Sequence, residues 1–262
     1  MTSKQAMLTL SGAGARTAFV FLMLFAMGCS NQQTAERLNS PYQSRRVWAV
    51  TPFANESGSA FADSFTLADQ FVRQLDTTPG IDVLPLNRTL AAMEAMKLRG
   101  VSSQAEAMGL MKSLGVDGLI VGTVSAFDPY DPPKLGVAIE LYTSERMERQ
   151  DLLDVRDLST AATPPNEIRF ANFRTPSQPV SIVSDVFDAK DPNVTRLLKR
   201  FATDRGSDGE TSDESWHRYR ISMDLYSEFV SYVVSWRLLR AESDRLTNLS
   251  GHSNENEKAS AP

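Results

Sequence analysis

The stretch from Ser113 to Thr143 holds the glycines that could do chemistry. Gly115, Gly118 and Gly122, with Thr123 directly after the last, suggest at first a phosphate-binding loop. Such a loop joins a strand to the N-terminus of a helix, so that free backbone amides point at the anion. Here the glycines join a helix C-terminus to a strand, and no lysine follows Gly122. The pattern favours glycines that shape a sheet, and Gly122 is expected to permit a bulge or close packing of a helix.

Three aspartates raise the question of a cation site. Asp185, Asp188 and Asp191 stand three residues apart, whereas a calcium loop needs alternate ligands and a turn glycine. His217 and His252 are the only histidines, so a histidine-based metal site is not expected either. We predict helix capping and solvation for the aspartates, and no metal or cofactor.

Catalytic residues are not apparent in the sequence. A serine nucleophile needs a sharp strand-to-helix turn and a histidine base, and neither is visible. Glu56 and Asp63 flank the first expected helix and could form a carboxylate pair, but acids near a helix start are ordinary helix stabilisers. The sequence therefore predicts a protein that is not an enzyme.

The N-terminus has the layout of a secretory signal. Lys4 and Arg16 precede an apolar run over residues 17–27, which is too short to span a bilayer as a permanent helix. An exported chain folds where disulfides are permitted, but a single cysteine cannot form one within the chain. We expect a signal peptide over residues 1–28 and a domain stabilised by packing alone.

Cys29, the only cysteine, directly follows the apolar run. The residues before it, Ala26, Met27 and Gly28, resemble the bacterial lipobox, in which a peptidase cleaves before a diacylated cysteine; that motif usually has leucine where Ala26 stands. The resemblance implies that Cys29 is lipidated, and Ser30 after it favours the outer membrane over the inner. Several acyl chains on one residue give firm anchoring. The alternative is a small buried hydrophobe.

Composition limits the partners and the domain organisation. The 262 residues are 42% hydrophobic and 23% charged, with a formal net charge of −5, so the clustered Lys and Arg that nucleic acid requires are not expected. We expect a polar tether over residues 29–45, an α/β domain over 46–187, a helical extension over 188–246 and a disordered tail over 247–262.

Strands and helices are expected to alternate through the domain. Apolar runs predict strands, and helical spacing predicts helices, including one that carries Phe61 and Phe65 on its apolar stripe. The order is strand, helix, strand, helix, helix, strand, strand, over residues 46–55, 57–80, 81–85, 87–100, 103–115, 118–127 and 134–143. This predicts an α/β (α+β) fold, a mixed sheet flanked by helices. A helix from Pro192 and a long one over residues 215–246 should pack on the domain.

Three short motifs carry a resemblance to a known family. The matching residues are Pro52, Phe53, Asn55 and Gly58, then Asn87 and Arg88, then Leu114, Gly115, Asp117, Ile120, Val121, Gly122 and Thr123. On these residues, the stretch 46–143 resembles the CsgG family of curli assembly and its relatives: the TolB N-terminal domain, the PelC lipoprotein of polysaccharide export and the lipoproteins that activate penicillin-binding proteins. The resemblance implies a periplasmic, membrane-tethered binding or assembly module, often oligomeric, without catalytic residues. The long amphipathic hairpins of the curli pore have no counterpart after Thr143.

Together these features predict a lipoprotein on the periplasmic face of the outer membrane, held in the bilayer by acylated Cys29. Its partners would be envelope proteins of unknown identity, and Tyr130 in the proline-rich hairpin loop is the candidate contact, with a rigid turn as the alternative. Two other functions stay open. One is a ring-forming homo-oligomer of a secretion or polysaccharide-export system, and the other, less favoured, is a divergent enzyme acting on envelope glycans.

Overall fold

A computed structural model describes residues 38–144, 178–205 and 212–259 of the chain. These residues belong to the second of two units, which spans residues 37–262. The signal peptide, Ala26, Met27, Gly28 and Cys29 lie outside the described residues, so the lipobox stays a prediction.

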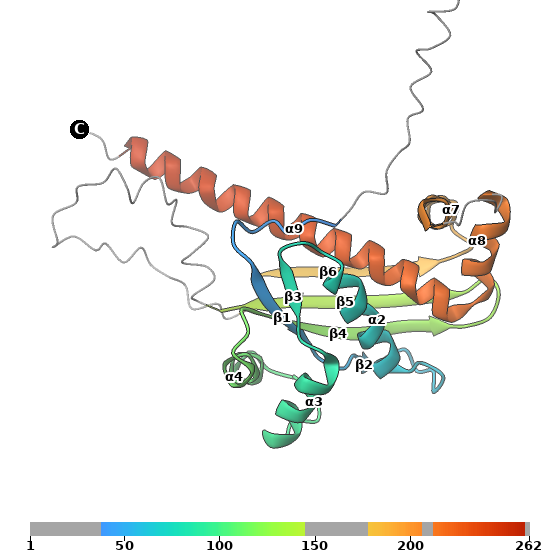
Figure 1. Ribbon diagram of the computed structural model, residues 1–262, viewed down its shortest axis with the longest axis horizontal. Coiled ribbons are helices and arrows are strands. Elements are labelled where there is room, and N and C mark those ends of the chain that lie inside the picture. Colours follow the sequence, from blue (N-terminus) through green and yellow to red (C-terminus); the bar gives the residue numbers. More distant parts are fainter. Residues whose placement is uncertain (1–37, 145–177, 206–211, 260–262) are drawn as a thin grey trace, which may run out of the picture. The chain divides into compact units, whose positions relative to one another are not determined.

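A mixed six-stranded sheet forms the centre of the domain (Figure 1). The strand order is β3-β1-β4-β5-β6, with the short β2 beside β4. β1 pairs in parallel with β3 and β4, and β4, β5 and β6 pair antiparallel. The bounds are β1 Arg46–Val50, β2 Ala54–Asn55, β3 Ile81–Val83, β4 Gly118–Asp128, β5 Lys134–Thr143 and β6 Ser181–Asp188. The predicted α/β class and the predicted element order are confirmed, with β2 and β6 as additions.

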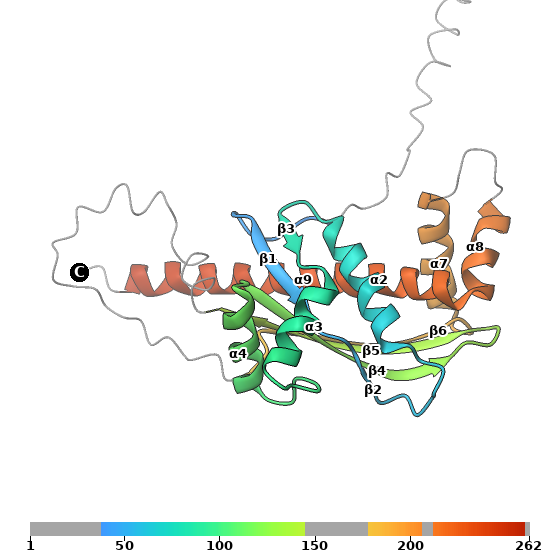
Figure 2. The same cartoon turned by 60° about the horizontal axis from the view of Figure 1, so that its bottom comes forward.

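Helices cover both faces of this sheet (Figures 1 and 2). Their bounds are α2 Ser64–Asp76, α3 Leu86–Ala95, α4 Gln104–Leu114, α7 Pro192–Arg205, α8 Ser212–Ile221 and α9 Met223–Ala259. α9 packs on α2, β5 and β6, whereas α3 and α4 pack on β1 and β4. No helix in the described part of the chain combines the length and apolar character needed to cross a bilayer.

Alternation along β1 divides the core into two clusters. Trp48 and Val50 pack into the larger cluster with α2 and α9, and Ala49 between them packs into the smaller one with α3 and α4. All three side chains are fully buried, as the two-residue period of a strand covered on both faces requires.

Short local signals set the helix ends. The Asp63 carboxylate accepts the backbone N–H groups of Phe65 and Thr66, at 3.0 and 3.1 Å, and so acts as the N-cap of α2. The Ser103 hydroxyl accepts the backbone N–H of Glu106 at the start of α4. Gly115 ends α4 with a positive φ of 68°, which glycine adopts at little cost.

Several expected helix bounds are wrong. The first helix, expected over residues 57–80, is α2 Ser64–Asp76, so Phe61 lies in the loop before it. α3 begins at Leu86 with Pro85 at the cap, so Asn87 lies inside the first turn and does not cap it. The single helix expected over residues 215–246 is broken at Ser222, and α9 continues to Ala259 through most of the expected disordered tail. Residues 247–259 hold no proline, and Gly251 does not end the helix although glycine disfavours a helix interior.

Candidate functional site

Two of the three glycines of the suspected phosphate loop, Gly118 and Gly122, lie against aromatic rings. Gly118 opens β4, and a Cβ there would lie 2.7 Å from the indole of Trp48. A Cβ at Gly122 would overlap the ring of Phe53, which also contacts Phe71. The expectation of a helix or a bulge at Gly122 is therefore corrected: a buried ring lies there, and the bulge of β4 falls later, near residue 125.

The three spaced aspartates serve structure in three different ways. Asp191 accepts the backbone N–H of Asn193 at 2.7 Å, as the capping prediction required. Asp188 accepts the Lys190 N–H, and that bond and the Lys134 ammonium 3.0 Å away hold the pKa of its carboxyl below the usual range. Asp185 forms an ion pair with Arg237 of α9. No group of metal ligands occurs among the residues that the structure describes.

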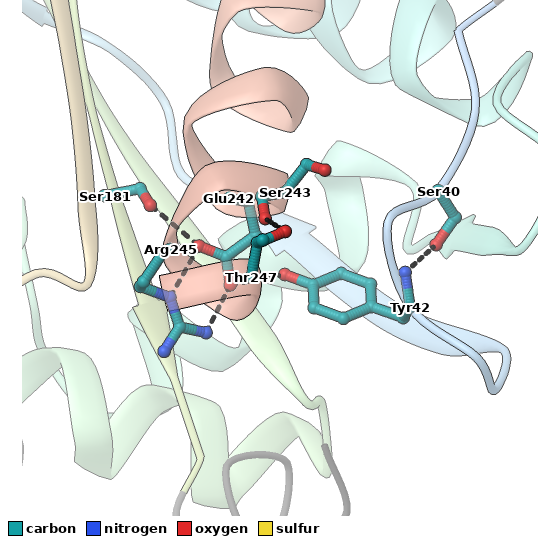
Figure 3. A network of polar contacts seen from close by, with 7 residues as sticks. All are labelled: Ser40, Tyr42, Ser181, Glu242, Ser243, Arg245 and Thr247. Carbon is teal, nitrogen blue, oxygen red and sulfur yellow. Dashed lines mark hydrogen bonds and ion pairs between the residues drawn. The ribbon is translucent and has the colours of Figure 1, made fainter. Parts of the chain in front are cut away.

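A buried carboxylate joins three distant parts of the chain (Figure 3). Glu242 of α9 is fully buried and accepts the hydroxyl of Tyr42 at 2.9 Å and the hydroxyl of Ser181 on β6 at 2.7 Å. The guanidinium of Arg245 donates to both carboxylate oxygens, from Nε at 2.9 Å and Nη2 at 2.5 Å. We name these four residues the root network, because they bind the first described segment of the chain to α9 and β6.

The described part of the expected tether, from residue 38 to residue 45, packs on the domain, and residues 29–37 of it lie outside the described residues. Leu38 and Tyr42 are buried, and the Ser40 N–H donates to the carbonyl of Pro79. The Tyr42 ring lies edge-on to Trp48, with ring centroids 5.9 Å apart. Sequence reasoning missed this contact because one tyrosine in a polar stretch produces no periodicity.

A pocket of about 270 Å³ lies at the other end of the sheet. The N-terminal segment joins the sheet at Arg46, near the start of β4, because Trp48 two residues later pairs with Gly118. The pocket lies at the opposite end of β4, beside Phe127 and Pro129. Its walls come from the loop before α2, from α2, from the end of β4 and from the start of α9: Phe61, Asp63, Thr66, Leu67, Gln70, Phe127, Pro129, Met223, Asp224 and Ser227.

Four large apolar side chains are exposed on the segments that form or adjoin this pocket, and Phe61 is the one that lines it. They are Phe61, Phe65, Tyr130 and Ile221, with 73%, 55%, 72% and 67% of their surface exposed. Each either lines the pocket or lies within two residues of a side chain that does. We name these four residues the distal patch. Large apolar groups gathered around a hollow mark an interaction site more often than scattered ones do.

Polar contacts brace the walls of the pocket. Arg220 of α8 forms an ion pair with Asp131 at the hairpin tip, 2.9 Å apart, and Asp128 accepts the backbone N–H of Tyr130. The Gln70 amide donates to the backbone carbonyl of Asp224 and so joins α2 to α9. The hairpin, α2 and the start of α9 are therefore held in place before anything binds, which lowers the entropy cost of binding.

A second exposed apolar pair is less suited to binding. Ile182 and Val186 lie exposed on β6, the edge strand of the described sheet. The Asp185 carboxylate accepts the Val186 N–H at 2.8 Å, which occupies a donor that an added strand would need. A charged side chain at an edge is a common means of preventing strand addition.

Comparisons with known proteins return similar structures but no family. No protein-family model and no curated protein sequence match the chain. The similar solved structures include the lipoprotein GNA1162 from Neisseria meningitidis, 14% identical over 63% of this chain and 99% of that one, with a TM-score of 0.35. They also include the LpoB C-terminal domain from Salmonella enterica, 14% identical over 50% and 85% with a TM-score of 0.32, and the PelC dodecamer from Paraburkholderia phytofirmans, 18% identical over 40% and 66% with a TM-score of 0.27. PelC is among the relatives that the sequence motifs indicated, but likeness at this level carries no statement about function.

Proposed function

We propose that this chain is a CsgG-like lipoprotein of the bacterial cell envelope, which binds a partner protein through the distal patch. In this proposal, acylated Cys29 anchors it to the outer membrane on the periplasmic side, and it acts by binding and not by catalysis. The observation that supports binding is the patch itself: four large apolar side chains, each more than half exposed, on the segments beside one pocket that Phe61 lines.

The separation of the root network from the patch fits such a role. α9 carries Met223 at the pocket and Glu242 in the root network, and at 1.5 Å per residue these lie on the order of 28 Å apart along the helix. The patch is thus at the far end of the sheet from the point where the N-terminal segment joins the domain. A partner can reach it without touching that segment.

We expect the double variant Phe61→Ser/Phe65→Gln to lose partner binding by at least about tenfold, because truncated apolar anchors typically cost 1–2 kcal/mol or more each. The measurement is photo-crosslinking in living cells, with a benzophenone amino acid in place of Tyr130 in the full chain. The wild-type background should give a discrete adduct that the double variant loses.

The matched control for that experiment is Ile182→Ser/Val186→Ser, which removes two exposed apolar side chains from β6. The control should keep the adduct. If both double variants keep it, or if both lose it, the distal patch is not the binding surface.

Anchoring has a separate test. Cys29→Ser should abolish metabolic labelling with an alkyne fatty acid, because the thiol is the acylated group in a lipobox, and should release the chain from the membrane fraction. Ser30→Ala, which leaves the cysteine in place, should label like the wild type. Labelling that survives Cys29→Ser would refute the lipobox interpretation.

A further inference from the structure

We propose that the partner protein inserts one large apolar side chain into the pocket beside the distal patch, and that lysine or arginine flanks this side chain in the partner's sequence. This inference rests on the proposed function and adds the chemistry of the partner. It combines three properties of the pocket: its size, the apolar side chains in its walls and the sign of the charge at its rim.

The pocket is large enough for one large side chain, and its lining is mainly apolar. Sites that enclose drug-sized molecules measure roughly 300–1,000 Å³, and this pocket of about 270 Å³ falls just below that range. Apolar side chains from three elements face it, among them Phe61, Phe127 and Met223. A leucine or an aromatic residue on a partner would place its apolar part there, as interface anchors commonly do.

The charge at the rim is negative. Asp63 and Asp224 are the charged side chains among the ten that line the pocket, and both are exposed. The Thr66 hydroxyl and then the Thr66 backbone N–H hold the pKa of Asp63 below its usual range, so this carboxylate stays ionised in neutral and mildly acidic solution. Asp128, also exposed, adds a third carboxylate next to Pro129 in the wall.

Two cations near the hairpin are already paired. Arg220 lies 2.9 Å from Asp131, and Lys134 lies 3.0 Å from Asp188. Among the residues that the structure describes, Asp63, Asp128 and Asp224 form no ion pair. An acidic segment or an anionic bilayer surface would be repelled by the like charge of Asp63 and Asp224. A segment with flanking cations would be attracted to these carboxylates, which speeds its association and orients it in the pocket.

The test is selection of random nine-residue peptides displayed on phage against the full chain, reconstituted in nanodiscs of zwitterionic phosphatidylcholine. Counter-selection uses the Phe61→Ser/Phe65→Gln variant. We expect the surviving peptides to carry one aromatic or large aliphatic residue with Lys or Arg within three positions. Patch-dependent peptides with neutral or acidic flanks would overturn this inference and leave the proposed function standing. If no peptide depends on the patch, both are overturned.

Charge variants then test the rim directly with one selected peptide. Asp63→Asn/Asp224→Asn removes two charges, and asparagine still caps α2. We expect this variant to bind the peptide about tenfold more weakly, because it loses two exposed ion pairs with the peptide. Its affinity should also depend less on salt concentration. The control Asp76→Asn/Glu94→Gln removes two exposed carboxylates elsewhere and should bind like the wild type. Equal affinity for all three proteins would overturn the role of the acidic rim.

Discussion

Glu242→Ala is expected to lower the free energy of unfolding by about 3 kcal/mol, because it removes the buried carboxylate that accepts every hydrogen bond of the root network. The hydroxyls of Tyr42 and Ser181 both donate to this fully buried carboxylate, and the variant loses both of these hydrogen bonds. Arg245 is partly exposed and can turn to water, so its loss adds less. The measurement is urea unfolding of the full chain followed by tryptophan fluorescence.

Two further variants show whether the loss of stability comes from the root network or from a change in α9 itself. Asp244→Ala changes an exposed carboxylate two residues along α9 and should cost less than about 0.5 kcal/mol. Tyr42→Phe removes one hydroxyl and should cost about 1 kcal/mol. A Glu242→Ala protein that unfolds at the same urea concentration as Asp244→Ala would show that the root network does not stabilise the domain.

The sequence predicted the strands and helices whose buried face is apolar. It missed β6, whose buried face is partly polar. β6 was missed because its inward side chains include Ser181 and Asp185, which pair with Glu242 and Arg237 of α9, while Ile182 faces outward. Both faces of β6 are therefore mixed: Ser181, Val183 and Phe187 are buried, whereas Ile182, Ser184 and Val186 are exposed, so the strand lacks a clear apolar and polar alternation. Only the contact with α9, more than fifty residues later in the chain, explains this pattern.

The candidate site was predicted in part for a similar reason. Tyr130 stood out because the prolines around it fix a turn at the tip of a hairpin. Phe61 and Phe65 were instead assigned to a helix stripe that packs inward, and the structure leaves both more than half exposed. Spacing identifies an apolar face but not what covers it, so a binding surface built from a helix start and a distant hairpin needs the tertiary structure.

We expect Gly122→Ala to destabilise the domain by about 3 kcal/mol, because overpacking a well-packed core typically costs 1–3 kcal/mol and the added methyl group would overlap the buried ring of Phe53. The ring has little freedom to move, since it packs against Phe71 of α2 with centroids 5.9 Å apart. Urea unfolding measures the loss. Gly100→Ala is the matched control, because a Cβ there meets nothing within 4 Å, and it should leave stability within about 0.5 kcal/mol of the wild type.

A second substitution decides whether the clash is the cause. Phe53→Leu in the Gly122→Ala background should restore part of the lost stability, because leucine occupies less of the space that the methyl group needs, although Phe53→Leu alone should destabilise. If the two substitutions are simply additive, the ring is not what requires glycine. Coupling between them would show that this glycine serves the packing of a sheet, since a phosphate-loop glycine would be needed for an anion and not for an aromatic ring on a neighbouring segment.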